Sequence, residues 1–145
     1  MPFRADQFAW LKIGTTPFVF EKHPFAVAST AERPARKQFT IKTLGDFSEL
    51  LIGMRPGRRV YLDGPYGGFT VDGLRSPGFV LVAGGVGITP MLSMLRTLAD
   101  RGNRRRHLLV VSARREEDLV LRQELAVLRR RIPAACIHTE LFDVG

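Results

Sequence analysis

The segment from residue 79 to residue 100 constrains the fold of this chain more than any other. It opens with a continuous apolar run, FVLVA at residues 79–83, which is typical of a strand buried on both faces of a parallel sheet. A glycine-rich turn, GGVGITP at residues 84–90, follows. We expect a helix over residues 91–100, with Thr89 as its cap and Pro90 at its first position.

This turn has the composition of a phosphate-binding loop. Gly84, Gly85 and Gly87 leave no side chain between the backbone and a ligand. The helix start that follows offers unpaired N–H groups and a partial positive charge, and Thr89 adds a hydroxyl. The pattern is not G-x-G-x-x-G and lacks the lysine of a P-loop. A tight strand-to-helix turn without a ligand is the alternative interpretation.

The rest of the second half continues the alternation of strand and helix. Residues 108–111 predict a second buried strand, and the acidic residues 116–118 favour the start of a second helix, which ends before Pro133. A third strand is expected from Ala135. The β-α-β-α-β order predicts a parallel sheet with right-handed connections. The second helix carries leucines at helical spacing: Leu121, Leu125 and Leu128.

The first half contains short strand-like segments separated by turn residues, a pattern that is typical of a barrel or sandwich. The fold expected is therefore a partial antiparallel β-barrel over residues 1–76, followed by part of an α/β parallel-sheet nucleotide-binding domain over residues 77–145. The segments expected in the first half are strands at residues 8–13, 37–44 and 59–63 and a short helix at residues 47–52.

Composition limits the function classes. A net charge of +8 favours anionic partners, and arginines cluster at residues 101–106 and 129–131. A nucleic-acid binder stays open on charge alone, but no nucleic-acid fold signature accompanies it, and solvated helix ends explain the same arginines. The single cysteine, Cys136, excludes an internal disulfide and is expected to be a buried small hydrophobe. No apolar stretch reaches the roughly 18 residues of a membrane span.

Four segments in order make the chain resemble the ferredoxin–NADP reductase superfamily, best its ferric-reductase and NADPH-oxidase-like branch. They are HPFAVAS at residues 23–29, KTLGDFS at 42–48, DGPYG at 63–67 and the glycine turn at 84–90. The resemblance implies that NAD(P)H passes a hydride to FAD and that electrons continue to a haem, iron or iron–sulfur acceptor. It implies a cytoplasmic location, with an electron-acceptor protein or haem-bearing membrane domain as partner and a possible contact with an acidic membrane surface.

The resemblance also assigns residues to the flavin. His23 would lie near the FAD phosphates and Phe25 against the isoalloxazine ring. Ala26 stands where the family usually has a Ser or Thr that hydrogen-bonds the flavin. Residues 64–67 would form a turn toward the nucleotide domain. The other residues implied at the FAD site are Pro24, Ser29, Lys42, Gly45, Phe47 and Ser48.

The NAD(P)H site implied by the resemblance takes the glycine turn and the end of the next strand. Ser112 and Arg114 suit a 2′-phosphate, which favours NADPH over NADH; a solvated basic loop is the alternative. The turn contributes Gly84, Gly85, Gly87, Ile88, Thr89 and Pro90.

The resemblance further implies that the chain is cut at both ends. The family's barrel begins before a segment such as residues 7–13, and its nucleotide domain ends in a cysteine-containing motif and a terminal aromatic residue. With Ala26, this expectation keeps a second function open, namely a non-catalytic nucleotide- or flavin-binding module.

Overall fold

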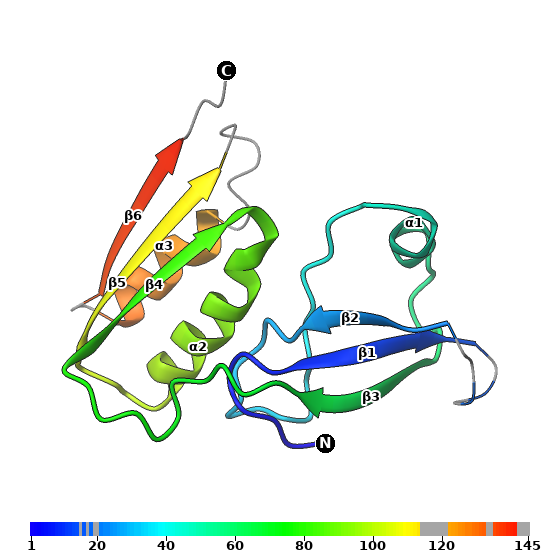
Figure 1. The fold of residues 1–145 in the computed structure, drawn as a ribbon, viewed down its shortest axis with the longest axis horizontal. Helices are drawn as coiled ribbons and strands as arrows, with labels where there is room; N and C mark the ends of the chain where they lie inside the picture. Colours follow the sequence, from blue (N-terminus) through cyan, green and yellow to red (C-terminus); the bar gives the residue numbers. More distant parts are fainter. Residues whose placement is uncertain (15, 17, 19–20, 114–121, 133–134, 142–145) are drawn as a thin grey trace.

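The computed structural model describes residues 1–14, 16, 18, 21–113, 122–132 and 135–141, the last range by its backbone. Two three-stranded sheets follow one another along the chain and lie side by side (Figure 1). The first is antiparallel and the second is parallel and carries two helices. The predicted order of an antiparallel β region and then an α/β region is confirmed.

The antiparallel sheet has the order β2-β1-β3, formed by β1 (Phe8–Ile13), β2 (His23–Ala26) and β3 (Val60–Tyr66). The strand predicted at residues 8–13 is confirmed, and the one predicted at 59–63 is longer. It continues through Gly64 and a cis Pro65 to Tyr66, which pairs with Phe8 beside a register shift in β1. The turn predicted at residues 64–67 is therefore wrong for its first three residues, because β3 extends to Tyr66, which pairs with Phe8. The described residues form an open sheet and not a closed barrel.

The strand predicted at residues 37–44 does not form. Phe39 makes one isolated bridge to Val27, and the Gln38 carbonyl accepts a hydrogen bond from the Ala28 N–H at 2.7 Å. Alternation of apolar and polar residues specifies which side chains share a face, but a strand also needs a continuous partner. Here β2 ends at Ala26, so the partner is lost after one bridge. The short helix is confirmed as α1 (Asp46–Ile52).

The parallel sheet has the order β4-β5-β6, formed by β4 (Gly78–Gly84), β5 (Arg106–Ala113) and β6 (Ala135–Leu141). The helices α2 (Ile88–Asp100) and α3 (Arg122–Arg131) connect them. The predicted β-α-β-α-β order is confirmed. The predicted helix start at residues 116–118, Leu121 and the side chain of Cys136 lie outside the described residues.

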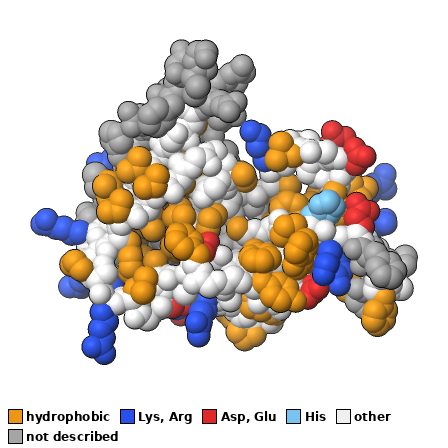
Figure 2. Space-filling model, viewed as in Figure 1, with side chains coloured by type: hydrophobic (Ala, Val, Ile, Leu, Met, Phe, Trp, Pro, Cys, Tyr) orange, Lys and Arg blue, Asp and Glu red, His pale blue; other side chains and the backbone are white. Residues whose placement is uncertain are grey.

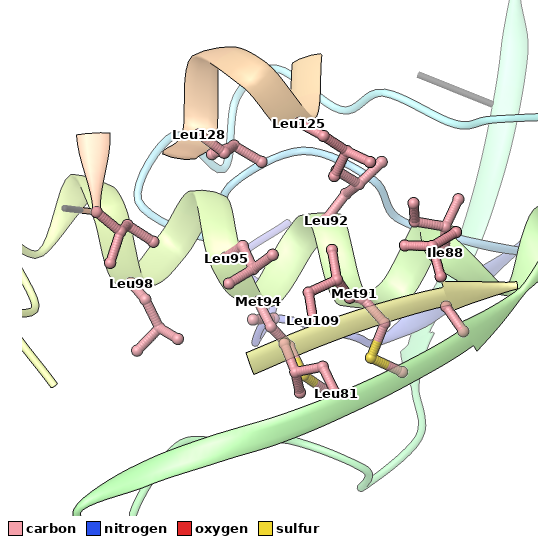
Figure 3. Close-up of a cluster of buried hydrophobic side chains, with 14 of the residues drawn as sticks. Leu81, Ile88, Met91, Leu92, Met94, Leu95, Leu98, Leu109, Leu125 and Leu128 are labelled. Carbon is pink, nitrogen blue, oxygen red and sulfur yellow. The ribbon is translucent and has the colours of Figure 1, made fainter. Parts of the chain in front are cut away.

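Both helices pack on one face of the parallel sheet (Figure 3). Leu81 and Ala83 of β4 are buried under α2, whereas Val80 and Val82 point the other way and are 69% and 65% exposed. The prediction that this strand is buried on both faces is therefore wrong for the described residues, because none of their helices covers the second face. The shared core includes Leu92, Leu95, Leu109, Leu125 and Leu128.

Candidate functional site

The glycine turn connects β4 to α2 through a short 3₁₀ segment, Gly85–Gly87. Gly84 and Gly87 have ordinary backbone angles, at φ −120° and φ −62°, and only Gly85, at φ 51°, needs the freedom of glycine. A Cβ placed on any of the three would meet no atom within 4 Å. Neither backbone strain nor packing inside the protein requires glycine at positions 84 and 87. The open space in front of them fits a ligand that approaches the backbone closely, as a diphosphate does.

The helix after this turn begins earlier than predicted, at Ile88 and not at residue 91. Its N-cap is Gly87, which makes no side-chain cap hydrogen bond, so the N–H groups of the first turn lack a side-chain partner. Thr89 is not the cap: it is buried, and its hydroxyl donates to the Val86 carbonyl at 2.8 Å. Thr89 therefore stabilises the turn, and its hydroxyl proton is not available to a ligand. Pro90 lies in the first turn, where a missing N–H costs least.

The end of β5 lies next to the turn. Gly84 and Ser112 are register partners in the parallel pair of β4 and β5, so Ser112 is at the carboxyl edge of the sheet beside the glycines. Ligands of open α/β sheets bind at this edge. Arg114, the other residue predicted here, lies outside the described residues.

Three residues predicted at the flavin site gather around one aromatic ring. His23 stacks on Phe47 with ring centroids 4.0 Å apart, and Phe25 lies 6.2 Å from the same ring at an interplanar angle of 17°. Phe47 comes from α1, and the other two come from one face of β2. Pro24 and Ala26 face the opposite side of the strand, with Trp10 and Phe8 as their register partners. Ala26 presents only a methyl group there.

That opposite side carries an aromatic surface that is partly exposed. Phe8 lies 6.4 Å from Trp10 and 5.9 Å from Tyr66, and the Lys22 ammonium lies 5.0 Å from the Trp10 ring centroid. Hydrophobic side chains gather over the antiparallel sheet in the space-filling view (Figure 2). The sheet thus offers aromatic groups with a cation beside them, which suits a flat, anionic cofactor.

Two serines predicted at the FAD site, Ser48 and Ser29, bond to backbone groups nearby. The Ser48 hydroxyl donates to the Gly45 carbonyl at 2.7 Å and accepts from the Leu44 N–H at 2.8 Å. The Ser29 hydroxyl accepts from the Gln38 N–H at 3.3 Å. Gly45, at φ 143° with open space around it, and the exposed Lys42 remain available to a phosphate.

Three polar residues of α2 were missed by the sequence analysis. The Ser93 hydroxyl donates to the Ser29 carbonyl at 2.8 Å, and the Arg96 guanidinium donates to the Ala28 carbonyl. The Ala31 N–H donates to the Thr97 hydroxyl at 2.9 Å. These bonds join the helix of the glycine turn to the chain leaving β2. Their signal in the sequence is polar residues three and four positions apart on an otherwise apolar helix.

Two further features of the described part of the chain bear on other functions. Among these residues, no group of three or more His, Cys, Asp or Glu is placed to hold a metal ion. Within the same residues, none of the helices is both long and apolar enough to cross a membrane.

Comparisons with known proteins agree with this geometry. Residues 81–144 match the family described as Oxidoreductase NAD-binding domain. The chain is 34% identical over 131 residues to the reductase component of propane 2-monooxygenase from Rhodococcus jostii. That match covers 88% of this chain and 35% of the relative, so the chain spans about a third of the relative's length.

Two solved structures have the same fold. A cytochrome P450 reductase from Amycolatopsis matches with a TM-score of 0.81 at 24% identity, covering 97% of this chain and 44% of that one. A mutant ferredoxin–NADP⁺ reductase from Plasmodium falciparum, in complex with 2′P-AMP, matches with a TM-score of 0.83 at 16% identity, covering 96% and 60%. None of these three proteins is a ferric reductase or an NADPH oxidase, so the similarities do not extend to the ferric-reductase and NADPH-oxidase-like branch.

Proposed function

We propose that this chain is a homologue of the FAD- and NAD-binding reductases of the ferredoxin–NADP reductase-like superfamily, and that it carries out the nucleotide-dependent half of such a reductase. NAD(P)H is the donor, FAD the bound flavin, and a separate redox centre the acceptor. We place the boundary between the flavin-binding and nucleotide-binding parts near residue 76.

The observation that carries the proposal is the open space at Gly84 and Gly87. Glycine at these positions serves neither the backbone nor the packing, so a ligand is the remaining reason for the missing side chains. The free N–H groups at the start of α2 face the same turn and suit a pyrophosphate. We assign Ser112 and Arg114 to the ribose end of the nucleotide, where they favour NADPH.

On the flavin side, we assign Phe25 and His23 to the ring system and phosphates of FAD, with Gly45 and Lys42 at its pyrophosphate. When bound, FAD accepts a hydride from NAD(P)H and passes electrons onward singly. The protein residues bind and orient; none of them needs to act as a nucleophile or a general acid. The bonds from Ser93, Arg96 and Thr97 hold the nucleotide helix against the flavin strand.

The acceptor that we propose is the iron-containing component of an oxygenase or a haem protein. The support comes from the relatives, one named as a monooxygenase reductase component and one as a cytochrome P450 reductase. The net charge of +8 is suited to an acidic partner surface.

The visible spectrum of the purified chain tests the proposal. FAD is added, unbound flavin is removed, and spectra are recorded before and after anaerobic NADPH or NADH. Retained flavin that bleaches supports the reductase, with faster bleaching by NADPH supporting the assignment of Ser112 and Arg114. Failure to retain flavin at micromolar concentration would reject the FAD site in this chain.

A second candidate is a module that binds the cofactors without turnover. The observation that favours it is Ala26, which offers no hydrogen-bond donor where related reductases usually have one. Retained flavin that stays oxidised under excess NADPH would select this candidate.

A further inference from the structure

A cavity of about 190 Å³ lies where the segment after β2 meets α2 and α3. It is distinct from the glycine turn, because Asp100 at its wall is twelve residues along α2 from Ile88, which is about 18 Å of helical rise. Four of its lining residues are arginines that come from three different parts of the chain: Arg33 and Arg36 from the segment, Arg96 from α2 and Arg131 from α3.

Among the described residues, two of these four arginines have a carboxylate ion-pair partner. Arg131 pairs with Asp100 and Arg96 pairs with Glu124. Within the part of the chain that the structure describes, Arg33 and Arg36 form no ion pair, so two positive charges facing the cavity are not balanced.

The Asp100 carboxyl at the wall of the cavity is held in its charged form. Burial by itself would raise the pKa of this carboxyl. Hydrogen bonds from Arg131 and Thr30, together with the charges of Arg131 and Arg33, hold the pKa below its usual value instead. Asp100 is one carboxylate among four arginines at the cavity wall.

An adjacent cavity shares Arg96 and Arg131 but has apolar walls from Val127 and Leu128. It adds no unpaired cation, so the unbalanced charge belongs to the first cavity alone. Guanidinium groups that converge from several directions are suited to an oxyanion, because each presents a planar fork of donors. The volume exceeds the roughly 30 Å³ of one water molecule several times.

We propose that this cavity binds a phosphate group, with Arg33 and Arg36 as its principal ligands and Thr30 at its edge. The bound group bridges the flavin-side segment to α2 and α3, so occupancy stabilises the contact between the two sheets. The inference does not depend on the proposed reductase function, since the cavity shares no residue with the sites assigned to FAD or NAD(P)H.

The probes are inorganic phosphate and phenyl phosphate, titrated into the full chain by calorimetry at constant ionic strength set with chloride. Both are expected to bind saturably and to raise the thermal midpoint. The double variant Arg33→Glu and Arg36→Glu is expected to weaken phosphate binding at least tenfold. Its matched control, Arg129→Glu with Arg130→Glu, makes the same charge change on exposed residues of α3 outside the cavity and is expected to keep binding.

Equal loss in both double variants, or no saturable phosphate binding by the wild-type chain, would overturn the proposal. If the glutamate pair does not fold, Arg33→Ala with Arg36→Ala serves the same comparison. Tighter binding of phenyl phosphate identifies the ligand as an organic phosphate, and equal binding identifies free phosphate. Flavin retention is measured on the same samples, so loss of FAD with intact phosphate binding rejects the reductase and leaves this site standing.

Discussion

At the scale of one residue, the substitution Gly84→Ala tests whether the glycine turn binds the pyrophosphate of the nucleotide. Its backbone angles suit alanine and nothing lies within 4 Å of the added Cβ, so Gly84→Ala should change the free energy of unfolding by less than about 0.5 kcal/mol. The same methyl group would occupy the space assigned to the pyrophosphate. We expect the Kd for NADP⁺, measured by calorimetry, to rise about tenfold, or about 1.4 kcal/mol.

Gly68→Ala is the matched control for that variant. Gly68 also has open space around its Cβ position, but it lies after β3 and away from the turn. It should leave both stability and the Kd for NADP⁺ unchanged. Unaltered nucleotide binding in Gly84→Ala would mean that the ligand does not approach this glycine.

Asp6 gives a second prediction at the residue scale, on pH. Burial raises its pKa to about 6, well above the value of about 3.9 in an unfolded chain. The folded state therefore holds the proton more tightly than the unfolded state. Its stabilising contribution is complete below about pH 4 and is lost as pH rises through 6.

Asp6→Asn removes this titration and keeps a residue type that tolerates the φ of 81° at this position. Urea unfolding at pH 4.5 and pH 7.5 should show a smaller loss of stability in the variant. At the higher pH, the variant should be more stable by about 1 kcal/mol, a figure that allows for the partial exposure of the carboxyl. Exposed Glu49→Gln makes the same charge change and should keep the wild-type pH dependence.

At the scale of elements, the spacing of apolar residues correctly predicted the strands and helices whose apolar face packs against a neighbouring element. The apolar run at residues 79–83 and the spacing of Leu125 and Leu128 gave the right strand and helix, because each buries its face against a neighbour. The alternation at residues 37–44 was as regular, but its partner strand is absent beyond one bridge. The start of α2 moved to Ile88, because the 3₁₀ turn at Gly85–Gly87 leads directly into the helix.

Gly78 allows the first residues of β4 and β5 to lie close together. A Cβ at this position would lie 1.7 Å from the carbonyl oxygen of Arg106, its register partner. Gly78→Ala must push the two strands apart at backbone level, and we expect it to cost about 3 kcal/mol or more in unfolding free energy. Gly84→Ala, at the other end of the same strand, is the control for strand propensity. A cost below about 1 kcal/mol would show that the first residue of β4 is not held against β5.

At the scale of the whole molecule, the sequence located motifs but not the contacts between them. The resemblance brought His23, Phe25 and Phe47 to one site, and the structure gathers them. It assigned Ser29 and Ser48 to the FAD site, and the hydroxyls of both residues bond to backbone groups nearby, since a hydroxyl in a turn satisfies the closest unpaired group first. The spacing of Ser93, Arg96 and Thr97 marks a polar stripe on α2, but it does not identify their partners more than sixty positions away.

Thr97 makes one of these long-range contacts. Its hydroxyl accepts from the Ala31 N–H at 2.9 Å and donates to the Ser93 carbonyl at 2.7 Å. Thr97→Val keeps the shape and leaves the Ala31 N–H without its partner, which should cost about 1–3 kcal/mol. Thr97→Ser keeps the hydroxyl, loses one methyl group, and should cost about 1 kcal/mol or less.

Two optical probes can follow the two sheets separately in these variants. Trp10, the single tryptophan, lies in β1 of the antiparallel sheet, whereas far-UV circular dichroism is dominated by α2 and α3 beside the parallel sheet. In the wild type, urea transitions from the two probes should coincide, because the bonds from α2 make the sheets unfold together. In Thr97→Val, the transition reported by Trp10 should occur at a lower urea concentration than the transition reported by circular dichroism. In Thr97→Ser, the two transitions should still coincide. Coincident transitions in Thr97→Val would show that Ser93 and Arg96 suffice to join the two sheets.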